Sequence, residues 1–209
     1  MTDNFDLHYL NIQDIDLCVN VHIKSFQKFF LTFLGRQFLN VLYTSITTDP
    51  TGIGWVIKAD KKVEGFVIGT SQPGGLYGRL IKRNWWRFGW AALPAFIRKP
   101  SILPRLLRAF TMPGQPLPAE NCGTLMSIAV DPAAQGSGMG KELVQAFLRE
   151  AKNRGLDFVN LTTDASGNDA TNAFYVSKGF KLHYSFTTPE GRLMNEYLFN
   201  LQAFENPEK

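Results

Sequence analysis

The chain is poor in the residue types that build disulfide frameworks and metal sites. Its 209 residues include two cysteines, Cys18 and Cys122, and three histidines. Two cysteines make no disulfide framework and have no metal-ligand spacing, and the histidines form no HxxxH pair. We therefore expect no metal site. A disulfide-rich secreted scaffold is excluded, and a reducing, cytoplasmic setting is the default expectation.

Long apolar runs are also missing. No apolar stretch reaches the roughly 18 residues that a membrane-spanning helix needs, and residues 1–4 lack the basic-then-apolar pattern of a signal peptide. Apolar residues make up 44% of the chain and charged residues 19%, which excludes a disordered chain. The length fits a single domain over residues 1–209. The formal net charge of +4 mildly favours an anionic ligand, partner or surface.

Acidic residues are absent between Glu64 and Glu120. Bases and aromatic residues are interleaved there, namely Arg79, Lys82, Arg83, Arg87, Arg98, Lys99, Arg105 and Arg108 with Trp85, Trp86, Phe88, Trp90, Phe96 and Phe110. The prolines of this segment allow only short helices. We predict that residues 73–118 form a basic, aromatic, helical insertion between the third and fourth strands of a core sheet.

Three interpretations of this insertion stay open. It could be a cap whose aromatic residues pack on the core while its bases face water. It could recognise an anionic acceptor, with arginines on phosphates and aromatic rings on a base or sugar. It could also touch a membrane surface through residues 76–112, because Trp85–Ile97 is an apolar stretch flanked by bases. The chain has no recognised nucleic-acid motif, so we expect no nucleic-acid partner.

The rest of the chain has a mixed α/β pattern. Asn11 is a good N-cap for a first helix. A second helical pattern covers about 31–46, a hairpin of strands follows at 53–59 and 62–70, and strands and helices then alternate. These later elements are a strand at 124–130, a helix at 140–154, a strand at 158–163, a helix at 168–178 and strands at 181–187 and 193–201.

A glycine-rich turn follows the strand at 124–130. The strand ends at Asp131-Pro132, and the turn then opens an amphipathic helix. Glycines let several N–H groups converge on one anion, and the N-terminus of a helix adds a partial positive charge. The turn therefore suits a pyrophosphate, although a tight turn without a ligand is the structural alternative.

The spacing of the glycines discriminates between phosphate-binding motifs. A P-loop requires GxxxxGK[ST], but Gly136 is one residue too close to Gly140, and Glu142 stands where Ser or Thr is required. A dinucleotide fold requires GxGxxG, whose third glycine is replaced by Lys141. The pattern Q/R-x-x-G-x-G/A fits, through Gln135, Gly138 and Gly140.

From about Gly123 to Phe180 the sequence resembles the GNAT superfamily of acetyl-CoA-dependent N-acetyltransferases. A second stretch, Asn168–Phe180, is similar to the family's N-x(6)-Y-x(3)-G-F signature. The resemblance implies an α/β GNAT fold, in which a central mixed, mostly antiparallel sheet is flanked by helices. A long insertion at 73–118 is not usual in that fold.

The resemblance also implies a site for acetyl-CoA as co-substrate, without a metal. The strand residues Ile128, Ala129 and Val130 would pair with the pantetheine arm, and a backbone N–H near Ile128 would stabilise the oxyanion. The pyrophosphate would bind the backbone amides of Gln135, Gly136, Ser137, Gly138, Met139, Gly140 and Lys141. Asn168 would bind the pantetheine or the adjoining backbone, with a helix N-cap as its structural alternative. Tyr175 would be the general acid, with an aromatic packed on the sheet as its alternative.

The general base and the acceptor stay open. Many relatives carry Glu near Thr124, and threonine cannot serve as a base; Glu120, Glu196, His183, His22 or a bound water could replace it. We expect a small-molecule amine acceptor, such as an amino sugar or nucleotide sugar, bounded by Lys24–Phe30 and the last strands. A protein or peptide acceptor, a hydroxyl acceptor and a non-catalytic acyl-CoA sensor are alternatives, and a dimer is one option for the oligomeric state.

Overall fold

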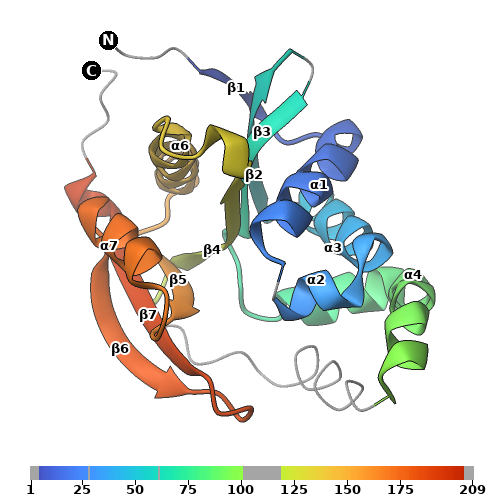
Figure 1. Ribbon diagram of the computed structural model, residues 1–209. Coiled ribbons are helices and arrows are strands. Elements are labelled where there is room, and N and C mark those ends of the chain that lie inside the picture. The colour runs from blue at the N-terminus through green and yellow to red at the C-terminus, as the bar shows by residue number, and fades with distance from the viewer. Residues whose placement is uncertain (1–4, 28, 61, 101–118, 205–209) are drawn as a thin grey trace.

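The computed structural model describes residues 5–27, 29–60, 62–100 and 119–204. These residues form a seven-stranded sheet with helices on both faces (Figure 1). The strand order is β1-β2-β3-β4-β5-β7-β6, and every neighbouring pair is antiparallel except β4 with β5. The prediction of a mixed, mostly antiparallel sheet flanked by helices is confirmed.

The elements have the following bounds. The strands are β1 (Asp6–Tyr9), β2 (Gly52–Ala59), β3 (Lys62–Thr70), β4 (Cys122–Val130), β5 (Phe158–Asp164), β6 (Lys181–Thr187) and β7 (Leu193–Asn200). The helices are α1 (Ile15–Ser25), α2 (Phe30–Leu34), α3 (Arg36–Thr47), α4 (Leu76–Arg98), α6 (Met139–Asn153) and α7 (Asp169–Ser177). Short 3-10 turns are η1 (Ile12–Asp14), η3 (Pro132–Ala134) and η4 (Leu201–Ala203).

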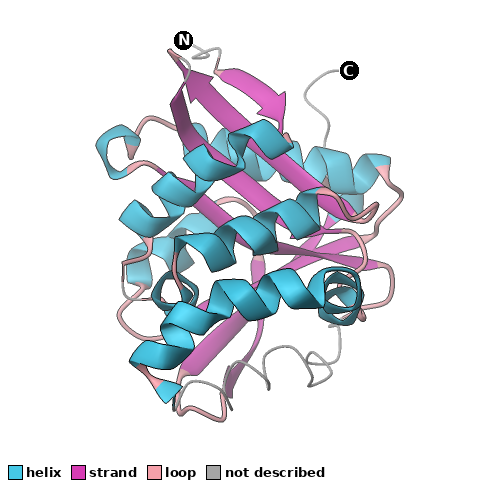
Figure 2. Cartoon of the chain, turned by 90° about the vertical axis from the view of Figure 1, so that its right-hand side faces the viewer, coloured by secondary structure: helices cyan, strands magenta, loops and turns pink. Residues whose placement is uncertain are grey.

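Two hydrophobic cores lie on opposite faces of the sheet. Helices α1, α3 and α4 pack with one face, and α6 and α7 pack with the other (Figures 1 and 2). Residues of β2 and β3 alternate between the cores: Val56 and Phe66 belong to the first, whereas Ile57 and Val67 belong to the second. From Gly65 onward β3 is buried on both faces, and Phe66, Val67 and Ile68 there form an uninterrupted apolar run.

Two local predictions differ from the structure. The helical pattern at 31–46 is split into α2 and α3 by Gly35, whose φ of 94° is not helical. Glycine adopts this conformation with little strain, and the apolar periodicity continues across the break. The sequence does not predict strand β1, because it has only four residues, most of them exposed, and pairs with β2 alone.

The described part of the insertion forms α4, between β3 and β4. Element α4 spans 23 residues, and Pro94 lies inside it rather than ending a helix as expected. Asn84, with φ −133° and ψ 23°, interrupts the helical geometry, so α4 is two shorter stretches joined at a kink. Proline's fixed φ is helical, and its position in α4 forfeits one backbone hydrogen bond. Residues 101–118 of the insertion lie outside the described residues.

Candidate active site

Strands β4 and β5 separate after a short shared segment. They pair only at Cys122↔Phe158, Gly123↔Val159 and Thr124↔Asn160. Beyond Thr124, β4 stays paired with β3 on its other side as far as Val130, with a register shift between Ile68 and Gly69. The backbone of β4 that faces β5 therefore has no strand partner there among the described residues, and a ligand with amide groups could occupy the opening as an added strand. We call this the β4–β5 opening.

The three strand residues assigned to pantetheine binding lie along this opening. Ala129 is buried, and Ile128 and Val130 are half-buried. Ala129 packs in the first core, whereas Ile128 and Val130 pack against the second, as expected for alternating strand residues. The Val130 carbonyl accepts a hydrogen bond from Ser25 Oγ at 3.1 Å, which joins the end of β4 to the end of α1.

The glycine turn directly follows β4. Asp131 ends the strand: its carboxylate accepts from the Ala133 N–H at 3.1 Å and from Lys24 Nζ at 2.6 Å. Gly136 and Gly138 then adopt φ of 84° and 92°, which favour glycine, and α6 begins at Met139.

The turn presents a row of unused backbone donors. The N–H groups from Gln135 to Gly140 donate to no acceptor among the described residues, whereas the N–H of Lys141 donates to the Gly138 carbonyl at 2.9 Å. Ser137 Oγ donates to the Ala134 carbonyl at 2.7 Å and so supports the turn. Free amides at the positive end of a fifteen-residue helix form an anion site. Among the described residues, the Lys141 amide is the only one of those assigned to pyrophosphate binding that already donates a hydrogen bond.

Helix α7 brings Tyr175 close to this region. A Cβ placed on Gly140 would lie 3.4 Å from the Phe174 ring, so the first turn of α6 and α7 approach closely. Tyr175 is 5% exposed, and its ring lies 5.3 Å from Phe174, 5.6 Å from Phe180 and 6.4 Å from Tyr197. Burial raises the pKa of Tyr175 well above its usual value, so the hydroxyl is protonated at neutral pH. Burial accounts for this shift without a hydrogen bond from the Tyr175 hydroxyl to any described residue.

Asn168 and Asn172 differ in their contacts. Asn168 is the N-cap residue of α7 by position, but its half-buried side chain makes no cap hydrogen bond. Asn172, which the sequence did not single out, accepts from Thr163 Oγ1 at 2.5 Å and from the Tyr197 hydroxyl at 3.2 Å. It also donates to the Asp164 carbonyl at 3.1 Å. Asn172 thus ties α7 to β5 and β7, whereas the Asn168 side chain is available to a ligand.

A buried polar chain begins where β4 and β5 part. Thr124 Oγ1 donates to Asn160 Oδ1 at 2.6 Å, and Asn160 Nδ2 donates to Glu196 Oε1 at 2.7 Å. Glu196 is 2% exposed, and its other oxygen, Oε2, has no hydrogen-bond partner among the described residues. Burial and the Glu196 carboxylate raise the pKa of the nearby Tyr184. Among the described residues this buried carboxylate forms no ion pair, so Glu196 is a candidate base by its position next to the opening.

A second buried group lies on the α1 side of β4. His22 Nδ1 and the Tyr43 hydroxyl are 2.6 Å apart, and that hydroxyl donates to Ser127 Oγ at 3.1 Å. Burial lowers the pKa of His22 to about 4, so the imidazole is neutral at pH 7. The other two candidate bases, Glu120 and His183, are exposed. Glu196 and His22 are therefore the internal candidates for a base.

The far end of β5 is bordered by two loops from distant parts of the sequence. Arg192, in the β6–β7 connection, forms an ion pair with Asp164 at 2.7 Å. The Arg192 guanidinium also lies 6.0 Å from the centroid of the Phe29 ring, in the connection between α1 and α2. The Lys24–Phe30 segment, expected to bound an acceptor, thus meets the connection between the last two strands at the end of β5.

Among the residues that the structure describes, no group of three or more His, Cys, Asp and Glu side chains is arranged to hold a metal ion.

Comparison with known proteins identifies relatives of this architecture. The model of the acetyltransferase (GNAT) family matches residues 20–180. The tRNA(Met) cytidine acetyltransferase TmcA of Nitrosococcus halophilus is 38% identical over 65 residues, which are 31% of this chain and 9% of that protein. The mycothiol acetyltransferase of Nocardiopsis dassonvillei is 40% identical over 63 residues, which are 30% of this chain and 19% of that protein. The matches therefore span only a small part of each relative's length.

A solved structure supports the fold over nearly the whole chain. The ribosomal-protein-S18-alanine N-acetyltransferase from Escherichia coli superposes with a TM-score of 0.58, 97% of each chain covered and 16% sequence identity. At this identity the likeness concerns the fold alone. The resemblance predicted from the glycine turn and the Asn168–Phe180 stretch is confirmed by the family match.

Proposed function

Because this chain belongs to the acetyltransferase (GNAT) family, we propose that it transfers the acetyl group of acetyl-CoA to an amine. The observation that carries the proposal is that the free amides of residues 135–140 directly follow the β4–β5 opening. The opening can receive an amide-bearing arm, and the free amides can bind an adjoining pyrophosphate. The two features are consecutive in the chain, so a single ligand can use both.

Each part of the donor has a candidate partner in this proposal. The amides from Gln135 to Gly140 bind the pyrophosphate, and the β4 backbone at Ile128, Ala129 and Val130 pairs with the pantetheine arm. The free side chain of Asn168 adds a hydrogen bond to that arm. Lys141, with its amide engaged, contributes its exposed ammonium group to the charge around the turn.

Acetyl-CoA supplies a thioester whose carbonyl carbon the amine attacks, so that a C–N bond forms and the C–S bond breaks. A backbone N–H near Ile128 stabilises the oxyanion. Tyr175 donates its hydroxyl proton to the departing sulfur, a role supported by its protonated state and its unpaired hydroxyl. Glu196 takes the amine proton through a bound water, because it is the internal carboxylate joined to Thr124 at the mouth of the opening.

The acceptor in this proposal is a small-molecule amine, with an amino sugar or nucleotide sugar as the leading class. Phe29 and Arg192 support this choice, since an aromatic face and a guanidinium at the end of β5 suit a polar ring. The named relatives act on unlike acceptors, from tRNA cytidine to a ribosomal-protein alanine, so their names support acetyl transfer more than any one acceptor.

A thiol-release assay tests the proposal. The full chain is incubated with acetyl-CoA and a panel of amino sugars, nucleotide sugars, polyamines, amino acids and peptides, and acetyl-CoA affinity is measured by titration calorimetry. We expect acetyl-CoA binding and amine-dependent thiol release with at least one amine of the sugar group. Binding without release for every amine would favour the sensor alternative, release with peptides alone would favour a protein acceptor, and absence of binding would refute the donor site.

A further inference from the structure

Helix α4 presents a second apolar face, opposite to the one that it buries. Its buried residues include Phe88, Ala91 and Ala95. Besides Tyr77, Trp85 and Phe96, four large exposed side chains of α4 recur at intervals of four, three and four residues, which places them along about 16 Å of one helix face. They are Trp86, 55% exposed, Trp90, 70%, Leu93, 42%, and Ile97, 71%. We call these four residues the α4 stripe.

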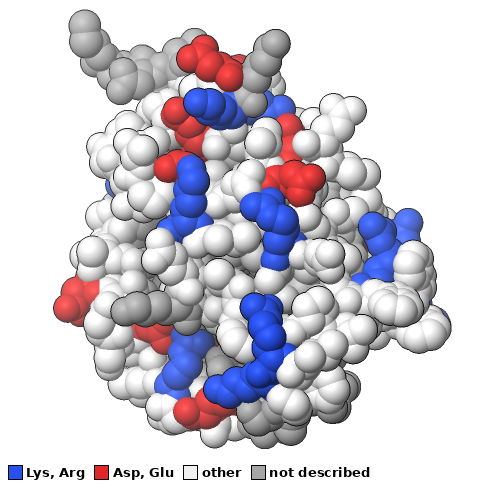
Figure 3. All heavy atoms as spheres, turned by 45° about the vertical axis from the view of Figure 1, so that its right-hand side comes forward, with Lys and Arg blue, Asp and Glu red and all other residues white. Residues whose placement is uncertain are grey.

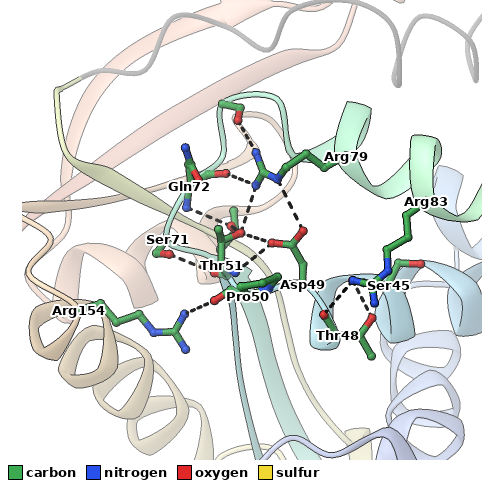
Figure 4. A network of polar contacts seen from close by, with 12 residues as sticks. Ser45, Thr48, Asp49, Pro50, Thr51, Ser71, Gln72, Arg79, Arg83 and Arg154 are labelled. Carbon is green, nitrogen blue, oxygen red and sulfur yellow. Dashed lines mark hydrogen bonds and ion pairs between the residues drawn. The ribbon is translucent and has the colours of Figure 1, made fainter.

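The start of α4 is fastened to the body of the protein (Figure 4). Arg79 donates to the carbonyls of Gly74 at 2.9 Å and Gln72 at 3.0 Å and to Thr51 Oγ1 at 3.2 Å. Its guanidinium lies 3.6 Å from the Asp49 carboxylate. The stripe lies beyond the kink at Asn84, and its orientation toward solvent is set by the burial of Phe88, Ala91 and Ala95 on the opposite side of the helix.

The exposed bases of α4 adjoin the stripe. Lys82 and Arg87 are exposed and form no ion pair among the described residues, and no acidic residue occurs between Glu64 and Glu120. Arg98 lies 5.6 Å from the centroid of the Phe33 ring, which is itself 37% exposed, so the apolar and basic surface extends onto α2. In Figure 3, where this side of the molecule comes forward, the blue group at the right edge has no red atoms beside it.

We propose that the α4 stripe binds the surface of an anionic lipid bilayer. Indole rings favour the interface between headgroups and acyl chains, and flanking Lys and Arg attract anionic lipids. A straight row of large side chains along one fixed helix suits a plane. No described helix is long and apolar enough to cross a membrane, so α4 lies along the surface.

A second copy of the chain fits this face less well. In a symmetric dimer the same patch meets itself, and Lys82, Arg87 and Arg98 would face their own copies without acidic partners from this segment. Anionic lipid headgroups supply the missing negative charge. The binding is also separate from acetyl transfer, because α4 packs on α2 and α3 rather than at the glycine turn.

Vesicle co-sedimentation of the full chain tests the proposal. Vesicles of phosphatidylcholine alone are compared with vesicles that also contain phosphatidylglycerol. We expect binding to the anionic vesicles only, weakened by salt. The double variant Trp86→Ser, Trp90→Ser and the charge variant Lys82→Glu, Arg87→Glu should each bind about tenfold or more weakly. Leu182→Ser, which changes a 53% exposed apolar residue of β6, should bind like the wild type.

Two outcomes would overturn the proposal. The first is wild-type protein that stays in the supernatant with anionic vesicles at low salt. The second is equal pelleting of the wild type and the double tryptophan variant, with both folded by circular dichroism. Sedimentation velocity tests whether a second copy of the chain covers the stripe instead. If the wild type does not bind vesicles but forms a dimer that the tryptophan substitutions dissociate, the stripe is a dimer interface. Thiol release in solution should be unchanged in these variants. Vesicle binding and acetyl transfer are therefore tested separately, and a failure of the acetyl-transfer proposal would not affect the vesicle result.

Discussion

Replacing Tyr175 with Phe removes one hydroxyl from a closely packed aromatic cluster. The ring is 5% exposed among Phe174, Phe180 and Tyr197, and phenylalanine fills the same space. Because the hydroxyl has no hydrogen-bond partner among the described residues, we expect the free energy of unfolding to change by no more than about 0.5 kcal/mol.

The same substitution should strongly reduce turnover. A positioned proton donor contributes roughly 100-fold to 10,000-fold to a rate, and burial keeps the Tyr175 hydroxyl protonated by raising its pKa. We therefore expect kcat for thiol release to fall about 100-fold, equivalent to about 2.7 kcal/mol in the barrier. Acetyl-CoA affinity should stay the same, since the phenolic oxygen is assigned to the leaving sulfur rather than to binding.

Tyr197→Phe is the matched control. Its ring lies 6.4 Å from that of Tyr175, but its hydroxyl donates to Asn172 at 3.2 Å. Loss of this bond should lower the free energy of unfolding by about 1 kcal/mol and leave kcat nearly unchanged. The rate of thiol release at saturating acetyl-CoA measures kcat, and urea unfolding measures the free energy of unfolding. Wild-type kcat in Tyr175→Phe, at unchanged acetyl-CoA affinity, would refute the assignment of the general acid.

Three further predictions concern stability and donor binding. Burial lowers the pKa of His22 to about 4, so the stability that neutral His22 contributes is complete above pH 6.5 and is lost as pH falls toward 4. In urea unfolding, the free energy of unfolding of the wild type should fall about 2 kcal/mol more than that of His22→Gln between pH 7 and pH 5. Equal losses in the two proteins would contradict this. Gly138→Ala, at φ 92°, should weaken acetyl-CoA binding about tenfold in calorimetry. Gly155→Ala, at φ 77° beyond the other end of α6, should leave the affinity unchanged. Equal affinities of the two variants would contradict the role of the glycine turn in acetyl-CoA binding. Arg79→Ala should destabilise the fold by about 1–2 kcal/mol because several hydrogen bonds at the start of α4 are lost. The control Arg87→Ala should change the free energy of unfolding by no more than about 0.5 kcal/mol. Similar thermal unfolding of the two variants would disprove the anchoring role of Arg79.

Local patterns were sufficient to predict the strand, the turn and the helix of the proposed donor site. The strand, the glycine turn and α6 are consecutive, and the apolar spacing and turn residues of that stretch are properties of neighbouring residues. The predicted helix at 140–154 is observed as Met139–Asn153, and the predicted strand at 124–130 lies within Cys122–Val130. Errors arose where tertiary contacts decide: β1 depends on pairing with β2, and α4 keeps Pro94 because its buried face packs on α3.

The sequence alone gave no reason to prefer Glu196 over the other candidate bases. Its link to Thr124 runs through Asn160, and each residue belongs to a different strand. The link arises because β7 inserts between β5 and β6, an order that no local spacing encodes. Asn172 was missed for a similar reason, since its partners Thr163 and Tyr197 lie on β5 and β7.

The two sides of the site therefore differ in how the sequence encodes them. The stretch proposed to bind the donor backbone runs without interruption from β4 through the glycine turn into α6, whereas Asn168 and Tyr175 join it from α7. The residues proposed for the acceptor side are Phe29 from the α1–α2 connection, Arg192 from the β6–β7 connection and Glu196 from β7. Each can change without disturbing the glycine turn, because none contributes to the turn's backbone. A family that keeps the donor stretch can accordingly change acceptors by substitutions in these separate segments, and variants of Phe29 and Arg192 should alter the KM for the amine while leaving acetyl-CoA affinity unchanged.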